Sequence, residues 1–157
     1  MVSPELLRRY PFFGGLSDAQ LRALSMISEE VAFEKGKTII EECEPAETLY
    51  LLIDGSIDLS YRSADELNLK PGPPKELAAG EVNPGEIFGL CSMIEPFMSN
   101  TTAKAAVPSR AIAMNGKALQ GLINEDIDLA NKLLRQTVRT LMEQLIATRV
   151  QLAAAQS

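Results

Sequence analysis

The chain has 157 residues, enough for one domain with a substantial core, and its hydrophobic content of 46% is ordinary for a globular protein. The net charge of -6 argues against a general role in nucleic-acid binding, which requires a basic surface. Because the sequence contains no histidine, it lacks the commonest general base and metal ligand, so we expect neither an enzyme nor a metal site.

The N-terminal part of the chain, residues 11–30, is predicted to form helices that lead into the rest of the domain. Ser17 is followed three residues later by Gln20, the pattern of a capping box at the start of a helix. Apolar residues then follow at helical spacing: Leu21, Leu24 and Ile27. Phe12 and Phe13, in the turn before this helix, are interpreted as core residues.

The next part of the chain has the pattern of β-strands. Two short β-prone runs around Gly36 predict a hairpin-like connection. Residues 48–53 and 56–61 are joined by Asp54 and Gly55, a pair typical of a two-residue type I′ hairpin turn. Apolar and polar residues alternate after this turn, so one face of the second strand is expected to be buried.

Residues 62–80 are polar and rich in proline and glycine. This composition predicts a long mobile excursion between two strands. We interpret it as a surface insertion that the domain tolerates. The alternative is a loop that binds a partner.

Residues 83–106 contain the most informative pattern in the chain. Pro84 and Gly85 predict a turn before a strand. Gly89, directly after Phe88, suits a sharp backbone bend or a close approach of two backbone segments. The following residues are predicted to form one short helical turn, whose first amides could bind an anion.

This stretch resembles the phosphate-binding cassette of the cyclic nucleotide-binding domain family. That family includes the catabolite activator protein and the regulatory subunits of cyclic-AMP-dependent kinase. Phe88 and Gly89 match the Phe-Gly of the cassette, and residues 102–105 fit its closing strand. The phrase Leu-Tyr-Leu-Leu-Ile-Asp-Gly at residues 49–55 resembles the family's signature strand and turn, and residues 11–24 resemble its N-terminal helices.

The resemblance implies a single domain of the α+β class over residues 1–157. Its centre would be an eight-stranded jelly-roll-like β-barrel at residues 31–114, flanked by N-terminal helices at 11–30 and C-terminal helices at 117–153. The sequence ends at Ser157 without the winged helix-turn-helix found in the family's transcription factors, so no DNA-binding domain is expected. A stand-alone sensor and a fragment of a longer protein are both open.

Two positions depart from the family's cassette where it holds the ligand. Leu90 stands where the family has the glutamate that binds the ribose 2′-hydroxyl. Ser99 stands where the family has the arginine that binds the cyclic phosphate, and a loop longer by one residue would place Asn100 there instead. The candidate ligand-binding positions implied by the resemblance are Phe88, Gly89, Leu90, Cys91, Ser99, Asn100, Thr101 and Thr102.

A pocket without these two charges is expected to be unusually apolar. Its candidate lining residues are Leu90, Met93, Phe97 and Met98. We expect these side chains to fill the pocket themselves, and the alternative is an open pocket for a different, less charged ligand. No cofactor is therefore predicted, although a cyclic nucleotide held in an unusual way is kept as an alternative.

The last predicted helix carries an apolar seam. Asn124 or Asp126 is expected to cap its start. The seam residues follow one another at steps of 4, 3 and 4, the a/d spacing of a coiled coil: Leu134, Val138, Leu141 and Leu145. The start of this stripe could pack on the barrel, but beyond Leu141 too little chain remains to cover it. We therefore predict a parallel homodimer through this helix, as in the family's bacterial regulators.

We predict a non-catalytic regulatory or signalling module that dimerises and has weakened or lost cyclic nucleotide contacts. The alternatives are a genuine receptor for a cyclic nucleotide or another small ligand, and an enzyme. A protein partner is possible, whereas direct binding to nucleic acid or membrane is not expected, because no apolar run has the length of a membrane span. Cys43 and Cys91 form no disulfide framework, and the N-terminus lacks a signal-peptide pattern, so a cytoplasmic location is expected.

Overall fold

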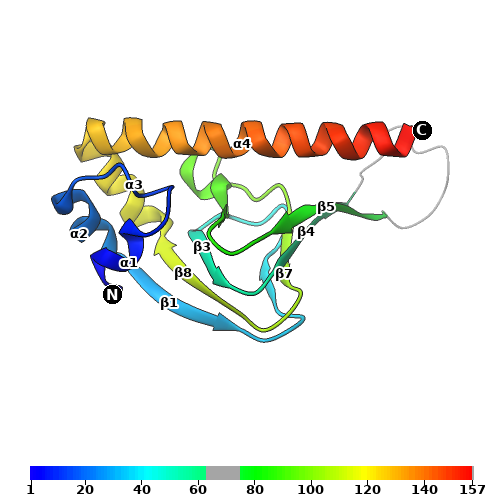
Figure 1. Ribbon diagram of the computed structural model, residues 1–157, viewed down its shortest axis with the longest axis horizontal. Helices are drawn as coiled ribbons and strands as arrows, with labels where there is room; N and C mark the ends of the chain where they lie inside the picture. The colour runs from blue at the N-terminus through cyan, green and yellow to red at the C-terminus, as the bar shows by residue number, and fades with distance from the viewer. Residues whose placement is uncertain (63–74, 157) are drawn as a thin grey trace.

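The computed structural model describes residues 1–62 and 75–156, and these form two antiparallel sheets of four strands each, with helices at both ends of the chain (Figure 1). The strand order is β1-β8-β3-β6 in one sheet and β2-β7-β4-β5 in the other. The predicted α+β, jelly-roll-like fold is confirmed, although within the described residues the two sheets do not close into a single barrel. The strands are β1 (Ser28–Phe33), β2 (Thr38–Ile40), β3 (Thr48–Asp54), β4 (Ile57–Arg62), β5 (Glu76–Val82), β6 (Ile87–Phe88), β7 (Thr102–Ala105) and β8 (Ser109–Asn115).

Two helices, α1 (Pro4–Arg8) and α2 (Asp18–Met26), precede the first strand. The capping box predicted at the start of α2 is present. The backbone N–H of Gln20 donates to Ser17 Oγ at 3.2 Å, and the backbone N–H of Ser17 donates to Gln20 Oε1 at 2.9 Å. The boundaries differ from the predicted ones, because α1 lies before residue 11 and β1 begins at Ser28 instead of residue 31.

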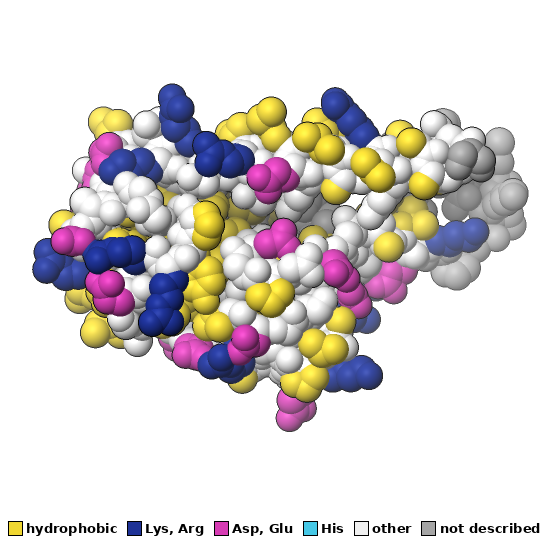
Figure 2. Space-filling model, viewed as in Figure 1, with side chains coloured by type: hydrophobic (Ala, Val, Ile, Leu, Met, Phe, Trp, Pro, Cys, Tyr) yellow, Lys and Arg dark blue, Asp and Glu magenta, His cyan; other side chains and the backbone are white. Residues whose placement is uncertain are grey.

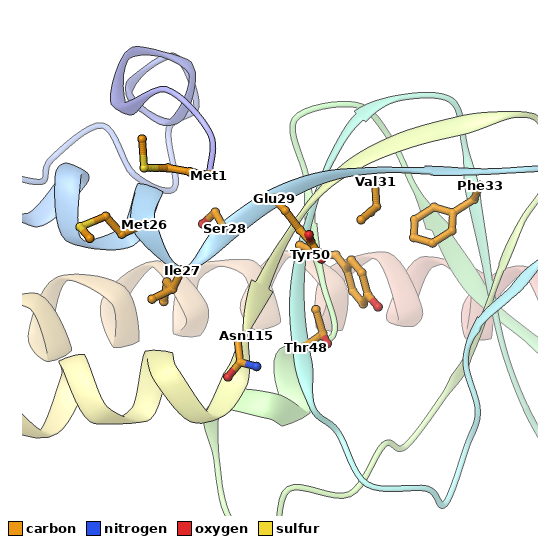
Figure 3. Close-up of a pocket in the computed structure, with 11 residues that line it drawn as sticks. Met1, Met26, Ile27, Ser28, Glu29, Val31, Phe33, Thr48, Tyr50 and Asn115 are labelled. Carbon is orange, nitrogen blue, oxygen red and sulfur yellow. The ribbon is translucent and has the colours of Figure 1, made fainter.

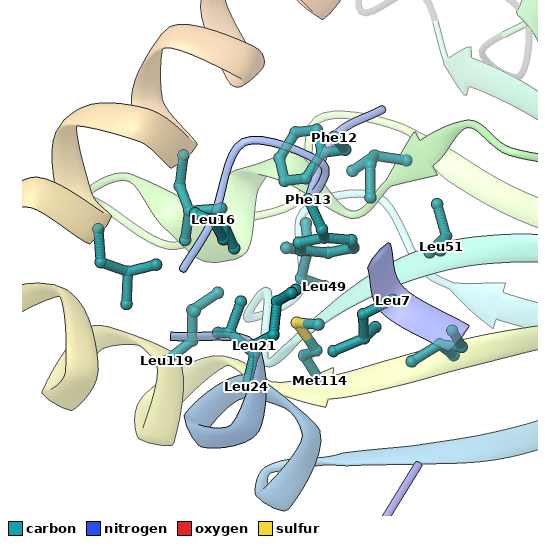
Figure 4. Packing of buried hydrophobic residues seen from close by; sticks show 14 of the residues in the cluster. Leu7, Phe12, Phe13, Leu16, Leu21, Leu24, Leu49, Leu51, Met114 and Leu119 are labelled. Carbon is teal, nitrogen blue, oxygen red and sulfur yellow. The ribbon is translucent and has the colours of Figure 1, made fainter. Parts of the chain in front are cut away.

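The helices α1 and α2 pack against the sheet that contains β3 and β8, and this contact forms the larger of the two cores (Figure 4). Phe12 and Phe13 are both buried there, as interpreted from the sequence, and their rings meet edge to face with centroids 5.0 Å apart. Leu7 from α1 and Leu24 from α2 are fully buried beside them. Each such side chain contributes roughly 1.5–3 kcal/mol when it leaves water, so this core holds the helices firmly on the sheet.

The two predicted hairpins are not formed. Strand β3 pairs with β6 and β8, whereas β4 pairs with β5 and β7, so the turn at Asp54 and Gly55 carries the chain from one sheet to the other. Gly55 has a φ of 105°, and a Cβ there would overlap the side chain of Ser109. Around Gly36, β1 and β2 likewise enter different sheets. The residues of each turn include a glycine with positive φ, but the strand that each flanking strand pairs with lies far away in the sequence.

The second strand of the supposed hairpin is only partly amphipathic. Ile57 is fully buried, as expected, but Tyr61 at the far end of β4 is 39% exposed. Part of the segment predicted as an excursion, 62–80, is instead a strand, because Glu76–Val82 forms β5 and pairs with β4. The rest of that segment, residues 63–74, lies outside the described residues.

The chain ends in two helices, α3 (Gly116–Glu125) and α4 (Ile127–Gln156). Asn115 caps α3, and Asp126, rather than Asn124, caps α4 by accepting from the backbone N–H of Leu129 at 3.1 Å. Helix α4 runs along the whole length of the molecule (Figure 1). Its first half is fastened to the domain, whereas every residue from Leu141 onward in its described part is exposed. No helix in the described residues is long and apolar enough to span a membrane.

Candidate functional site

The Phe-Gly bend of the cassette is a close contact between two backbone segments. Gly89 has a φ of 79°, and a Cβ placed on it would lie 2.6 Å from the carbonyl oxygen of Thr48 in β3. Phe88 of β6 lies opposite Tyr50 of β3, and the two rings stack with centroids 4.8 Å apart. Only glycine combines this backbone conformation with this proximity, so the bend predicted from the sequence is a fixed feature of the fold.

A short 3₁₀ helix, η1 (Leu90–Met93), follows the bend, in the place where one helical turn was predicted. The Ser92 hydroxyl donates to the carbonyl of Gly89 at 2.7 Å. From α3, Gln120 Nε2 donates to the carbonyls of Ser92 and Met93 at 3.3 and 3.2 Å. From α4, the Thr137 hydroxyl lies 3.6 Å from the sulfur of Met93. Both C-terminal helices therefore touch the cassette directly.

A cavity of about 370 Å³ opens beside this turn, between the cassette, the sheet that contains β2, and α4. It is lined by Ile40, Leu59, Ala79, Phe88, Gly89, Leu90, Cys91, Met93, Ile94, Ser99, Asn100, Thr101, Leu134, Thr137, Val138, Leu141 and Gln144. The pocket is therefore open, and the expectation that its own side chains fill it is wrong. Two of the expected plugs, Phe97 and Met98, do not line it, and Met98 is 43% exposed.

Seven of the eight candidate ligand-binding positions come together at this cavity: Phe88, Gly89, Leu90, Cys91, Ser99, Asn100 and Thr101. Thr102 does not, because it belongs to β7 and its hydroxyl accepts from the backbone N–H of Glu42 at 3.1 Å. Whether any of them binds a ligand stays a prediction.

The described side chains that line the cavity carry no charge. No Lys, Arg, Asp or Glu is found among the described residues that line the cavity. Lys104, the nearest basic residue of the closing strand, is exposed and lines a different surface hollow together with Glu41 and Glu42. An anion in the cavity would therefore have backbone amides and hydroxyls for partners but no cation.

Ser99 is held in place by its backbone. Its carbonyl accepts from the backbone N–H of Cys43 at 2.8 Å, and its N–H donates to the carbonyl of Glu44 at 2.9 Å. Cys43 itself has a φ of 67°, so this turn uses a left-handed residue to reach the cassette loop. Ser99, one of the two residues expected at the family's arginine position, is only 8% exposed, and two backbone hydrogen bonds connect it to Cys43 and Glu44.

The sequence did not identify the part of α4 that walls the cavity. Leu134, Val138 and Leu141, predicted to form a dimer seam, line the cavity, whereas Leu145 does not. Thr137 and Gln120, which hold η1, carried no recognisable signal, because each is an ordinary helical residue whose partner lies far away in sequence. A helical face that contacts a cavity can be identified only once the helix is docked.

A second cavity of about 380 Å³ lies beneath β1 at the end of the domain near α2 (Figure 3). Met1 and Met26 stand at one side of it, and Tyr50 points into it from β3. Burial raises the pKa of the Tyr50 hydroxyl above its ordinary value, and a hydrogen bond with Thr48 opposes that rise. No residue of the cassette lines this space, so we regard the cavity at η1 as the candidate site.

No group of three or more metal-ligating side chains converges anywhere in residues 1–62 and 75–156. The two cysteines are free thiols, Cys43 exposed and Cys91 half-buried at the candidate site.

Known proteins share the sequence pattern as well as the fold. The sequence model of the family described as "Cyclic nucleotide-binding domain" matches residues 30–126. Among curated proteins, the CRP-like cAMP-activated global transcriptional regulator of Mycobacterium tuberculosis is 28% identical over 137 residues, which cover 87% of this chain and 58% of that protein. The chain thus spans little more than half the length of this relative.

Two solved structures resemble most of this chain. A protein from Geobacter metallireducens GS-15, described as a cyclic nucleotide-binding protein, has a TM-score of 0.80 and 33% identity over 92% of this chain and 99% of that one. The sensor domain of the transcriptional regulator DNR from Pseudomonas aeruginosa has a TM-score of 0.67 and 26% identity, with coverage of 90% and 89%.

Proposed function

Because this chain belongs to the cyclic nucleotide-binding domain family, we propose that it is a non-catalytic regulatory module whose hold on cyclic nucleotides is weakened and which forms a homodimer through α4. It is a regulatory domain similar to the sensor part of transcription regulators. A cytoplasmic location belongs to the same proposal, because both cysteines are free, as a reducing compartment would keep them.

The uncharged cavity is the main support for a weakened hold on cyclic nucleotides. Leu90 and Ser99 occupy the positions at which the resemblance implies a glutamate for the ribose and an arginine for the phosphate. A hydrogen bond to a charged group contributes roughly 1.5–3 kcal/mol. Losing both would cost about 3–6 kcal/mol, or roughly a hundredfold to ten-thousandfold in affinity.

A variant that restores both charges tests this argument. We expect the double variant Leu90→Glu, Ser99→Arg to bind cyclic AMP or cyclic GMP at least about a hundredfold more tightly than the natural chain. The matched control is the swapped variant Leu90→Arg, Ser99→Glu, which carries the same groups in the wrong places and is expected to gain nothing. Isothermal titration calorimetry measures all three, and urea unfolding checks that each variant is folded.

Two results would contradict this part of the proposal. One is tight, saturable heat from the natural chain with cyclic AMP, cyclic GMP or a cyclic dinucleotide, because the missing charges would then be unnecessary. The other is equal affinity for the restored and the swapped variant. The single variant Leu90→Glu, at a half-buried position, provides an intermediate step if arginine at the buried position 99 disturbs folding.

The second part of the proposal depends on the apolar seam of α4. Val138, Leu141 and Leu145 are 55%, 49% and 50% exposed, although an apolar stripe of this length is normally covered. Figure 2 shows hydrophobic side chains gathered along α4 on the viewed face. The a/d spacing of these residues suits a second copy of the same helix. A parallel dimer would cover the stripe beyond the part of α4 that contacts the domain.

The change Leu141→Glu with Leu145→Glu is expected to give monomers, because four carboxylates would meet at the seam of a dimer. The control Ile146→Glu with Val150→Glu also replaces two exposed apolar residues by glutamate on the same helix, but at positions outside the a/d spacing, and it should stay dimeric. Sedimentation velocity measures both. An unchanged mass of the seam variant, or a monomeric natural chain, would refute the dimer.

A further inference from the structure

The cavity beside η1 has the size and shape of a small-ligand site. Its volume of about 370 Å³ lies within the ordinary range for such sites, roughly 300–1,000 Å³. Most of its lining residues are apolar, and they come from three directions: the sheet, the cassette and α4. The cavity is also concave, unlike the exposed face of α4 farther along the chain.

The polar groups in the lining can form hydrogen bonds but carry no charge. They are Ser99, Asn100, Thr101, Thr137 and Gln144, together with the Cys91 thiol. The Thr137 hydroxyl is already used, since it donates to the carbonyl of Leu133 at 2.9 Å. The remaining groups are therefore the ones that could orient a bound molecule.

Ser99 is the most informative of these groups. Its residue is 8% exposed, and within the described part of the chain its hydroxyl has no hydrogen-bond partner. No fully buried side-chain polar atom among the described residues lacks a partner, so this hydroxyl is not fully buried, and Ser99 lines both this cavity and a neighbouring hollow beside Glu41, Glu44 and Glu47. A neutral donor or acceptor on a ligand would satisfy it, and a buried hydroxyl gains from such a partner.

An anion would be poorly accommodated in the same space. It would lose hydration and meet hydroxyls and backbone amides but no cation, and a buried charge without an opposite charge carries a penalty. An apolar molecule, by contrast, would bury apolar side chains of the lining, among them Ile40, Phe88 and Leu90. The absence of charge and the apolar lining thus favour the same class of ligand.

We infer that this cavity binds an uncharged, largely apolar small molecule with at least one hydrogen-bonding group that meets the polar part of its lining. This inference rests on the proposed function, because it identifies the ligand class of the same regulatory site. Such a ligand would touch the cassette and α4 at once, at the residues that begin the dimer seam.

Two fluorescent probes that differ by a single charge test the inference on the full chain. N-phenyl-naphthylamine is uncharged and apolar, and anilinonaphthalene sulfonate is its close analogue with a sulfonate. We expect the neutral probe to bind saturably with one site per protomer, and the sulfonate at least about tenfold more weakly. Equal or tighter binding of the sulfonate would overturn the inference.

The two cysteines locate the bound probe. Cys91 lines the cavity, whereas Cys43 is exposed and does not. The neutral probe should therefore slow maleimide labelling of Cys91 and leave the labelling rate of Cys43 unchanged. Binding without protection of Cys91 would place the probe outside this cavity and overturn the inference.

A matched pair of tryptophan variants gives a second check. Val138→Trp places a large ring at the cavity wall and should weaken binding of the neutral probe at least about tenfold. Val150→Trp is on the same helix at a more exposed position that does not line the cavity, and it should bind as the natural chain does. Equal binding by both variants would contradict the inference.

Calorimetry with cyclic AMP separates the two proposals. If neither the probe nor cyclic AMP binds, the ligand class is wrong and the weakened nucleotide site is unaffected. If cyclic AMP binds tightly and displaces the probe, the weakened nucleotide site is refuted, whereas binding of the neutral probe in the cavity is not.

Discussion

Replacing Gly89 with alanine tests whether the bend of the cassette is fixed by backbone proximity. Gly89 has a φ of 79°, and alanine in that left-handed conformation costs about 1–2 kcal/mol. The new Cβ would also lie 2.6 Å from the carbonyl oxygen of Thr48, against about 3.3 Å for a close C···O contact. Since that oxygen belongs to the central strand β3, it cannot move without shifting the sheet.

Gly36 offers a control, because alanine there would carry the cost of the left-handed conformation without a close contact of the new Cβ. Its φ is 87°, and a Cβ there would meet nothing within 4 Å. We expect Gly36→Ala to cost about 1–2 kcal/mol of unfolding free energy. Gly89→Ala should cost about 2 kcal/mol more, because overpacking against a fixed group typically adds 1–3 kcal/mol.

The assay is thermal and urea unfolding of the natural chain and both variants. For a domain of this size, an extra loss of about 2 kcal/mol lowers Tm by roughly 4–8 °C beyond the control. The urea midpoint should fall correspondingly, with an unchanged m value. Equal losses for the two variants would refute the contact with Thr48 as the reason for glycine at position 89.

Two further changes test the fold around the site. Tyr50 has a folded-state pKa above its ordinary value because of burial, so the folded protein keeps the proton longer than the unfolded chain and stability falls as pH rises from about 10 toward the raised pKa. Tyr50→Phe should flatten that alkaline decline in urea midpoints, and an unchanged slope would show that the burial of this hydroxyl is not responsible. Gln20→Ala should lose about 1–3 kcal/mol in urea unfolding, because Gln20 completes the capping box of α2 and its Nε2 donates to Asp126 and Asp128 at 3.2 and 2.8 Å. A loss equal to that of the isolated cap variant Ser17→Ala would show that the link from α2 to α4 contributes nothing.

Some features of the fold and of the site followed from neighbouring residues alone. The capping box at Ser17, the bend at Gly89 and the short helix after it were all predicted, and the structure contains each of them. These features depend on chemistry that adjacent residues supply: a hydroxyl that accepts from an amide three residues away, or a residue without a Cβ where φ is positive.

Strand pairing did not follow from local pattern. Asp54 and Gly55 have the composition of a tight hairpin turn, yet they connect the two sheets, because β3 and β4 find better partners in β8 and β7. The cavity was also mispredicted as filled. Its far wall is α4, whose Leu134, Val138 and Leu141 were assigned to a dimer seam by their spacing.

The sequence by itself determined which short segments form turns, caps, strands and a long amphipathic helix, and it contains the uncharged residues Leu90 and Ser99 in the cassette. Only the tertiary structure decided which strands share a sheet, that the space beside Gly89 is open, and that α3 and α4 hold η1 through Gln120 and Thr137. The reason is that each of these contacts joins residues far apart in the chain. Their geometry depends on how complete elements dock, and the identity of nearby residues does not specify it.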